Sequence, residues 1–249
     1  MIENNIESMI FGIHPVLEAL EEGKSVDKVF LKKGMEGDSG RHLMEKLRFY
    51  KVPFQFVPVE KLNRLTRKNH QGVVAMISPV EFASLESLIQ SLYEEGKVPL
   101  LVALDGVTDV RNFGAIARSA DCLGANGIII PFKGSAAVSA DAVKTSAGAL
   151  MRLPVCKVIT LKETLQYLVD SGLRIVGFSE KAKQDLHLSD LKGPMVILMG
   201  SEEDGISPEL RPLISEMVRI PMAGKTSSLN VSVSAGIALY EVWRQRNEG

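Results

Sequence analysis

The stretch that decides the fold is Arg219-Ile220-Pro221-Met222-Ala223-Gly224-Lys225-Thr226-Ser227-Ser228-Leu229-Asn230-Val231-Ser232. It starts at the end of a short apolar run, residues 217–220, and continues through small and polar residues. From residue 229 to 243 apolar residues recur at helical spacing, so the pattern predicts a strand, a loop and a long helix. Polar side chains at the start of that helix, together with its unpaired backbone N–H groups, can face a ligand. A capped helix that binds nothing is the simpler interpretation of this loop alone.

Strand-like and helix-like segments alternate from residue 98 onward. Continuous apolar runs predict strands at 100–104, 127–130, 173–178, 195–199 and 217–220. Helical patterns lie between them at 114–123, 141–150, 161–171, 208–215 and 229–246. Apolar strands that alternate with helices are typical of a parallel sheet covered on both faces. Ligands bind such sheets beyond the carboxyl ends of the strands.

The first 80 residues show a separate α/β pattern, and their number is sufficient for an independent domain. Helices are expected at 8–23, 41–50 and 60–65, and strands at 26–31, 54–57 and 73–77. Ser78-Pro79-Val80-Glu81 is the predicted boundary. We therefore expect a small α/β domain at 1–80, a linker helix within 81–97 and a larger parallel-sheet domain at 98–249.

The composition is that of a soluble globular protein: of 249 residues, 45% are hydrophobic and 24% charged, and the net charge is −1. No basic field covers the whole chain, which argues against a nonspecific DNA-binding protein. Residues 61–70 do form a local basic patch without an acidic residue, through Lys61, Arg64, Arg67, Lys68 and His70. We interpret this patch as a phosphate-contacting surface, and a solvated charged face is the alternative.

Other features of the sequence narrow the class of protein. Cys122 and Cys156 form no CxxC pair, and their apolar neighbours predict buried, reduced thiols. The N-terminus lacks the apolar core of a signal peptide, and no apolar run approaches the ~18 residues of a membrane span. We therefore expect a cytoplasmic protein with no membrane partner. The four histidines lack metal-ligand spacing, so no metal is expected.

Two more loops follow strands at the same predicted edge of the sheet. One contains Asn112 and Arg118, which as isolated residues are equally well explained by a helix cap and a surface ion pair. The other, 200–205, has glycines on both sides of an acidic turn and would make a poor phosphate cradle. Gly224-Lys225-Thr226 is not a P-loop, because Arg219 stands where that motif needs its first glycine.

In order, the three loops resemble the three motifs of the SpoU (TrmH) family of RNA ribose 2′-O-methyltransferases, in the SPOUT superfamily. The first motif matches at Asn112 and Arg118, and the second at Gly200, Glu202 and Gly205. The third matches from Ile220-Pro221-Met222 to Ser228-Leu229-Asn230-Val231-Ser232. The resemblance covers residues 98–246, and residues 6–78 resemble the family's N-terminal substrate-binding domain. The chain departs from common family patterns at Val110-Arg111 and at Met151, which bears on substrate preference.

The resemblance implies a fold that residue patterns could not supply, a C-terminal α/β domain with a deep trefoil knot. It implies S-adenosylmethionine (SAM) bound in the knot, a homodimer through the knotted domain, and RNA rather than DNA as partner. By motif position, SAM would contact Met199, Gly200, Ile220, Met222 and Leu229. The catalytic group would comprise Arg118, Asn112, Glu202, Ser228 and Asn230.

The reaction implied is an in-line attack of a ribose 2′-oxygen on the methyl carbon of SAM, with the nucleophile held about 3–3.5 Å away. A guanidinium stays protonated at neutral pH, so Arg118 suits stabilisation of the developing alkoxide better than the role of base. The pairing of the two domains favours a guanosine ribose in 23S rRNA as the target. The alternatives are a tRNA ribose methyltransferase and a noncatalytic RNA-binding ribosome-assembly factor that keeps the knot.

Overall fold

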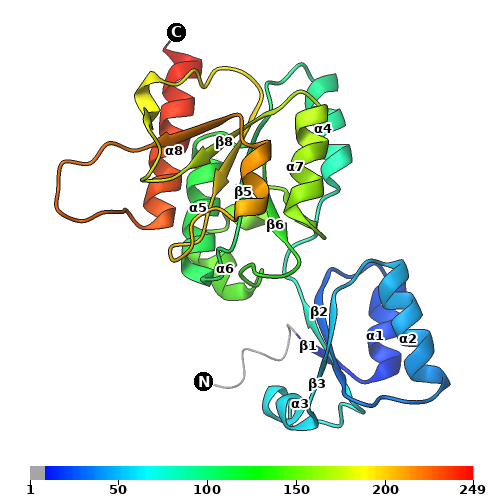
Figure 1. The fold of residues 1–249 in the computed structure, drawn as a ribbon. Coiled ribbons are helices and arrows are strands. Elements are labelled where there is room, and N and C mark those ends of the chain that lie inside the picture. Colours follow the sequence, from blue (N-terminus) through cyan, green and yellow to red (C-terminus); the bar gives the residue numbers. More distant parts are fainter. Residues whose placement is uncertain (1–8, 249) are drawn as a thin grey trace. The chain divides into compact units, whose positions relative to one another are not determined.

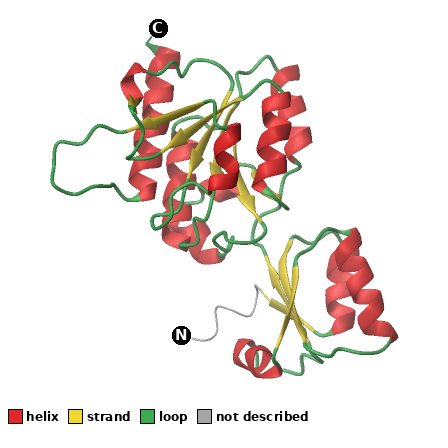
Figure 2. Cartoon of the chain, in the orientation of Figure 1, coloured by secondary structure: helices red, strands yellow, loops and turns green. Residues whose placement is uncertain are grey.

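The computed structural model describes residues 9–248, and its chain divides into two compact units. The first contains the residues up to Glu81 together with Val138–Ala140, and the second contains Phe82–Ala137 and the residues from Asp141 onward. Each unit is built on its own sheet with helices packed against it, as Figures 1 and 2 show. The expected α/β class is confirmed. The trefoil knot stays a prediction.

The first unit is a four-stranded sheet with two long helices on one face. Its strands are β1 (Met9–Phe11), β2 (Val26–Lys32), β3 (Phe54–Val57) and β4 (Val73–Ile77), in the order β1-β4-β2-β3. Its helices are α1 (Ile13–Glu21), α2 (Asp38–Phe49) and the short α3 (Val59–Leu65). Val29 and Leu31 of β2 face the core shared with α1 and α2, while α3 inserts Leu62 on the other face (Figure 1).

The helix expected at 8–23 is wrong over its first part, because Met9–Phe11 form a strand. This strand pairs antiparallel with β4, Met9 opposite Met76 and Phe11 opposite Val74. Gly12 then takes a φ of 95°, which disfavours any residue with a side chain, and turns the chain into α1. The apolar spacing fits a helix equally well, so the partner strand far along the sequence decides the outcome.

The second unit holds a seven-stranded sheet in which every strand pair is parallel. Its strands are β5 (Leu100–Leu104), β6 (Gly127–Pro131), β7 (Val155–Val158), β8 (Arg174–Phe178), β9 (Gln184–Asp185), β10 (Met195–Met199) and β11 (Glu216–Arg219). Their order is β7-β6-β5-β10-β8-β11-β9. The sequence patterns predicted five of these strands and missed the short β7 and β9.

Helices cover both faces of this sheet. They are α4 (Leu85–Glu94), α5 (Val110–Cys122), α6 (Ala140–Thr145), α7 (Leu161–Asp170) and α8 (Val231–Asn247). One face packs against α4 and α7 through a core that contains Leu85, Leu165 and Leu198, and α5 packs against α8 on the other. Because Leu85 and Ile89 enter this core, α4 belongs to the second unit and is not a free linker.

Two helices expected here are shorter or tighter than their patterns suggest. The helix predicted at 141–150 ends at Thr145, because Ala147 and Gly148 both take positive φ, and a 3₁₀ turn (Ala149–Met151) follows. Residues Pro208–Leu213 form a 3₁₀ helix that contains Pro212. A third 3₁₀ turn, Leu186–Leu188, follows β9.

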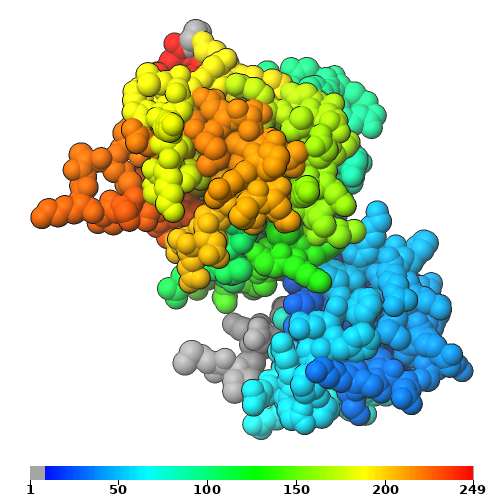
Figure 3. Space-filling view, viewed as in Figure 1, coloured from blue at the N-terminus to red at the C-terminus, as the bar shows by residue number. Residues whose placement is uncertain are grey.

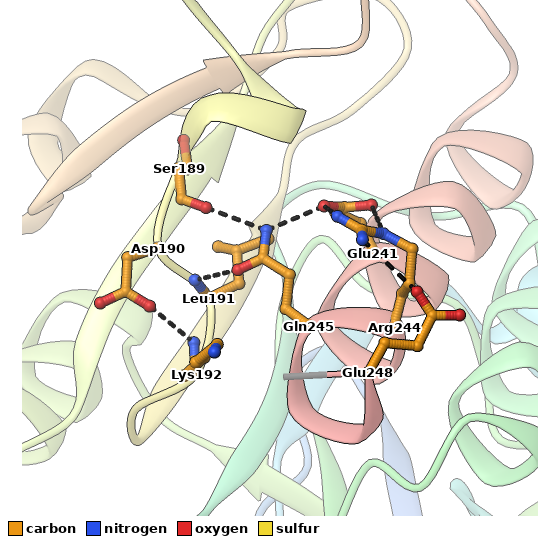
Figure 4. A network of polar contacts seen from close by, with 8 residues as sticks. All are labelled: Ser189, Asp190, Leu191, Lys192, Glu241, Arg244, Gln245 and Glu248. Atoms are coloured by element: carbon orange, nitrogen blue, oxygen red, sulfur yellow. Dashed lines mark hydrogen bonds and ion pairs between the residues drawn. The ribbon is translucent and has the colours of Figure 1, made fainter.

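The C-terminal half of α8 is fixed by side chains that hydrogen-bond to distant backbone. Figure 4 shows Gln245 reaching from α8 to the segment 189–192, where its Oε1 accepts from the Leu191 N–H at 2.9 Å and its Nε2 donates to the Ser189 carbonyl at 3.0 Å. Arg246 donates to the carbonyls of Val98 at 3.0 Å and Gly193 at 2.7 Å. These bonds hold the helix whose other end forms part of the site below.

The two thiols lie in different surroundings. Cys156 is buried in β7, and burial raises the pKa of its thiol to about 12. Cys122 is exposed at the end of α5, so the expectation that both thiols are buried is wrong for this one. Within residues 9–248, no helix is long and apolar enough to cross a membrane.

Candidate active site

The site lies where four neighbouring parallel strands end. The strands β5, β10, β8 and β11 are adjacent in the sheet, so the loops that follow them meet at one edge. The loop after β11 extends away from the body of its unit, as the darker orange segment at the left of Figure 3 shows, and residues 221–230 are all exposed. The three loops that the sequence singled out follow β5, β10 and β11, so the topology brings them together.

A cavity of about 430 Å³ opens at this edge, a size within the range of cofactor sites. All five residues predicted to contact a cofactor line it: Met199, Gly200, Ile220, Met222 and Leu229. Three of the predicted catalytic residues line it as well, namely Glu202, Ser228 and Asn230. The cavity thus combines apolar walls from the loop after β11 with polar groups from the other two loops.

Gly200 lets the loop after β10 fold tightly back on itself. Ser201 and Gly205 exchange two backbone hydrogen bonds of 3.1 Å each, which closes a small hairpin that lines the cavity. A Cβ atom at Gly200 would lie 2.1 Å from the carbonyl carbon of Gly205, so no residue with a side chain fits there. The glycine is therefore required by close backbone approach, as its position after a buried strand suggested.

Three side chains from the three loops form one hydrogen-bonded cluster. The Asn112 amide donates to Oε1 of Glu202 at 3.1 Å. The Asn230 amide donates to the same oxygen at 2.7 Å and to Oδ1 of Asn112 at 3.0 Å. The backbone N–H of Val231 approaches Glu202 Oε1 at 3.5 Å. Glu202 is thus the shared acceptor that joins the first motif to the third.

Helix starts place two of these residues. Asp109 caps α5 by accepting the backbone N–H of Asn112 at 2.8 Å, so Asn112 lies in the first turn and its side chain is free for Glu202. Asn230 caps α8, where its Oδ1 accepts from the backbone N–H of Ser232 at 2.9 Å. The cap explanation considered for Asn112 therefore applies to Asp109 instead, and Asn230 both caps and joins the cluster.

Arg118 lies apart from this cluster. It is on α5, six residues beyond Asn112 and so about 9 Å further along the helix axis, and its side chain is exposed. Among residues 9–248 it forms neither an ion pair nor a side-chain hydrogen bond, and it does not line the cavity. The structure therefore leaves its guanidinium free to meet a group that comes from outside the chain.

The basic patch of the first unit divides into exposed and buried members. Lys61, Arg64, Arg67 and Lys68 are exposed. His70 is buried: its Nδ1 accepts the backbone N–H of Gly72 at 2.9 Å, which leaves Nε2 to donate to Asn63 Oδ1 at 2.9 Å. Both ring nitrogens are occupied, so the expectation that His70 contacts RNA is corrected to a role in holding the turn.

The sequence interpretation overlooked one wall of the cavity. Phe178, Ser179 and Glu180 line it from the end of β8, between the loops that were predicted. Their position directly after a buried parallel strand is the signal that could have revealed them. Glu180 adds a second carboxylate besides Glu202, so the polar side of the cavity carries negative charge.

Family models match both units of the chain. The SpoU rRNA methylase family matches residues 99–240, and the RNA 2′-O ribose methyltransferase substrate-binding domain matches residues 9–83. The chain belongs to the SpoU methylase family. The expected resemblance is thereby confirmed in both units, and the protein is a methyltransferase of this family.

Relatives of this SpoU methylase are similar over almost its whole length. YacO of Bacillus subtilis, whose name places it among TrmH family tRNA/rRNA methyltransferases, is 32% identical over 96% of each chain. An uncharacterised tRNA/rRNA methyltransferase of Mycolicibacterium paratuberculosis is 40% identical and aligns with 95% of this chain and 77% of its own. The crystal structure of the SpoU methyltransferase AviRb from Streptomyces viridochromogenes, in complex with AdoMet, matches with a TM-score of 0.62, 29% identity and coverage of 97% and 91%.

SpoU methylases take the methyl group from S-adenosylmethionine, and the cavity of this chain suits that cofactor. Apolar side chains of Ile220, Met222 and Leu229 offer a wall for an adenine ring. The glycine at position 200 leaves backbone groups accessible where a Cβ would intrude. Glu180 and Glu202 provide negative charge that tolerates a sulfonium and its amino group.

Proposed function

We propose that this protein transfers a methyl group from S-adenosylmethionine to a ribose 2′-hydroxyl of RNA, and that the target is a guanosine in 23S rRNA. The observation that carries the proposal is the cluster of Asn112, Glu202 and Asn230 at the cavity lined by all five expected cofactor residues. A noncatalytic RNA-binding factor would have no need for three loops joined by one carboxylate beside such a cavity.

The residues of the site divide the work of binding and positioning. S-adenosylmethionine, when bound, supplies a methyl group on a sulfonium that is already an activated leaving group. Met199, Gly200, Ile220, Met222 and Leu229 would hold it, with Glu202 fixing the loops around it. The amides of Asn112 and Asn230 are oriented by Glu202, and with Ser228 they would position the acceptor ribose.

Arg118 acts on the RNA side of this arrangement. A guanidinium that remains protonated can stabilise the negative charge that develops on the 2′-oxygen and can hold the adjacent phosphate with its planar fork. Its exposed position and lack of a partner within the described residues suit a group that meets the substrate. We therefore assign it as an electrostatic stabiliser.

Substitution of Arg118 tests this role. Arg118→Ala should lower methylation of rRNA by at least about 100-fold, the usual effect of removing such a charge, while SAM binding measured by calorimetry stays unchanged. Arg211→Ala, an exposed arginine of the same unit that does not line the cavity, is the matched control. Near-normal turnover by Arg118→Ala would refute the assignment.

The acceptor atom can be tested on the RNA itself. Once the methylated nucleotide is mapped in total RNA with and without the gene, a single 2′-deoxy substitution at that nucleotide should abolish acceptance. Methylation that persists on the deoxy substrate would show that a base is the acceptor. The same map distinguishes rRNA from tRNA, which the names of the relatives leave open.

The basic surface of the first unit would position the RNA through its phosphates without reading sequence. Lys61, Arg64, Arg67 and Lys68 are exposed and none forms an ion pair within residues 9–248. Replacement of Lys61, Arg64 and Lys68 by Gln in the full-length protein should weaken rRNA binding and leave SAM binding intact. Unchanged activity on rRNA would refute the role of this surface.

We further propose that the protein is a cytoplasmic homodimer through its second unit. Along α8, Val233, Ile237 and Tyr240 repeat at helical spacing and are 49%, 36% and 51% exposed, so they form an apolar stripe that residues 9–248 leave partly uncovered. Trp243 extends the stripe by stacking on Tyr240, with the ring centroids 5.9 Å apart. Val233→Glu with Ile237→Glu should convert a dimer to a monomer in light scattering; a wild-type monomer would refute this proposal.

A further inference from the structure

One face of the sheet in the first unit packs against the short helix α3, whereas the two long helices α1 and α2 pack on the other. Alternation along the strands sends Val29, Leu31 and Ala75 toward α1 and α2, and it sends Phe11, Phe30 and Val74 to the opposite face. Among residues 9–248, α3 is the helix that adds apolar side chains to the cluster on that face, through Leu62 and Leu65. Phe11 and Phe30 on this face are partly exposed.

The two phenylalanines lie in one row across the sheet. Phe11 of β1 and Phe30 of β2 are both directly opposite Val74 of β4, which lies between them. Neighbouring strands are about 4.8 Å apart, so the two rings start from backbone positions separated by about 10 Å. The buried Val74 between them fixes this spacing.

Lysine side chains lie close to both rings, two near Phe30 and one near Phe11. The ammonium groups of Lys28 and Lys61 lie 5.2 Å and 5.0 Å from the centroid of Phe30, and that of Lys68 lies 5.3 Å from the centroid of Phe11. Lys28 comes from β2, Lys61 from α3 and Lys68 from the turn before β4, so three separate segments direct cations to this face. Within residues 9–248, none of these three lysines forms an ion pair.

Aromatic rings beside unpaired cations are the two components by which proteins bind single-stranded nucleic acid, with bases stacked on the rings and phosphates held by the cations. A purely structural cation–π contact needs one cation for a ring, whereas two ammonium groups lie near Phe30 and repel each other unless an anion joins them. A double-stranded RNA would offer no free base for these rings.

We propose that the α3 side of the first sheet binds an unpaired segment of the substrate RNA, with bases stacking on Phe11 and Phe30 and phosphates held by Lys28, Lys61 and Lys68. This inference rests on the proposed RNA substrate and adds to it the strand state of the RNA and the residues that select it. The exposed basic side chains contribute affinity, and the two rings contribute the preference for unpaired bases.

Binding by the full-length protein tests this. The probe is a fluorescently labelled 12-nucleotide RNA of CA repeats, alone and annealed to its complement, measured by anisotropy. Phe11→Leu and Phe30→Leu should each weaken binding of the single strand roughly 5- to 100-fold, the effect of losing one stacked base, and leave binding of the duplex unchanged. Phe30→Tyr keeps the ring and should bind like wild type.

The salt dependence of RNA binding should distinguish the contribution of the lysines from that of the phenylalanine rings. Lys61→Gln should reduce the slope of log K against log salt for the single strand by about 0.7, whereas Phe30→Leu should leave that slope unchanged. Phe49→Leu is the matched aromatic control, since Phe49 is 77% exposed at the end of α2, on the helix side of the same unit. It should bind like wild type.

Three results would overturn the inference: single-strand binding by Phe11→Leu and Phe30→Leu equal to wild type, an equal loss for single strand and duplex, or an equal loss in Phe49→Leu. If Phe30→Leu does not fold, Phe11→Leu and Lys61→Gln give the decision. The proposed function is tested by a different result: it is refuted if the wild-type protein transfers no methyl group to RNA. If the wild-type protein methylates RNA normally and Phe11→Leu and Phe30→Leu bind single-stranded RNA like wild type, the stacking surface is refuted and the proposed function stands.

Discussion

The side-chain amide of Asn230 donates a 2.7 Å hydrogen bond to Oε1 of Glu202, from the start of α8 to the loop after β10. The same oxygen accepts the amide of Asn112 at 3.1 Å from α5. One carboxylate oxygen of the loop after β10 therefore binds side chains from the loops after β5 and β11, strands that lie on either side of β10 with β8 between β10 and β11. This arrangement makes Glu202 an organiser of the site rather than a solvated acidic side chain.

Glu202 can be tested by removing its carboxylate. Glu202→Ala leaves the amides of Asn112 and Asn230 without their charged acceptor, so we expect kcat/KM to fall about 10- to 100-fold, as for loss of a hydrogen bond to a charged group. Glu202→Gln keeps an acceptor oxygen and should lose less. Glu203→Ala removes an exposed carboxylate from the same turn and serves as the control. An equal loss of kcat/KM in Glu203→Ala would mean that the negative charge of the turn matters, and not the hydrogen bonds of the cluster.

The tight hairpin predicts a sharp difference between two glycines. Gly200→Ala would place a Cβ 2.1 Å from the Gly205 carbonyl carbon, so the loop must open, with a loss of about 1–3 kcal/mol in the free energy of unfolding and loss of SAM binding. Gly224→Ala has no atom within 4 Å of its Cβ and should be tolerated. Thermal unfolding and calorimetric titration with SAM check both; equal behaviour of the two variants would contradict the steric argument.

The thiols should react at very different rates. Cys122 is exposed and Cys156 is buried with its thiol pKa raised to about 12, so a thiol reagent at pH 8 should label one cysteine in the folded protein and two in denaturant. Peptide mapping should place the first label on Cys122. Rapid native labelling of Cys156 would show that β7 opens in solution.

Stability in acid should depend on Glu241. Its hydrogen bond with Arg244 lowers the pKa of the Glu241 carboxyl below its ordinary value of 4.5, so the pair stabilises the folded state above pH 4.5. The contribution is lost as the pH falls through the lowered pKa. Glu241→Gln should therefore be less stable than wild type by roughly 1 kcal/mol at pH 7, and the difference should shrink toward pH 3. A difference that stays constant across this range would contradict the assignment.

The sequence predicted most of the second unit, because a strand buried on both faces is apolar along its whole length. It missed β9, which has only two residues, and β7, where Lys157 interrupts the apolar run. It placed Met9–Phe11 in a helix because apolar spacing alone does not separate an edge strand from a helix start. The break after Thr145 depends on positive φ at Ala147, a residue type that gives no warning of it. The knot is a property of chain threading, so no local pattern predicts it.

Some residues of the candidate site could be predicted from the sequence and others could not. The five residues predicted to contact a cofactor all line one cavity, because their motif positions correspond to the ends of parallel strands, which the sheet brings together. Phe178 and Glu180 were overlooked because their loop has no unusual composition. His70 was misassigned because a histidine within a basic run looks exposed, whereas its ring closes a turn through Gly72 and Asn63.

The most direct test of the central claim is the chemical identity of the methylated nucleoside. Purified protein, SAM with a labelled methyl group and RNA from cells that lack the gene should be incubated, and the RNA digested to nucleosides for mass spectrometry. We predict label in 2′-O-methylguanosine from 23S rRNA, and none when Glu202→Ala with Arg118→Ala replaces wild type. Label on a base, or no transfer by the wild-type protein to any RNA, would contradict the account.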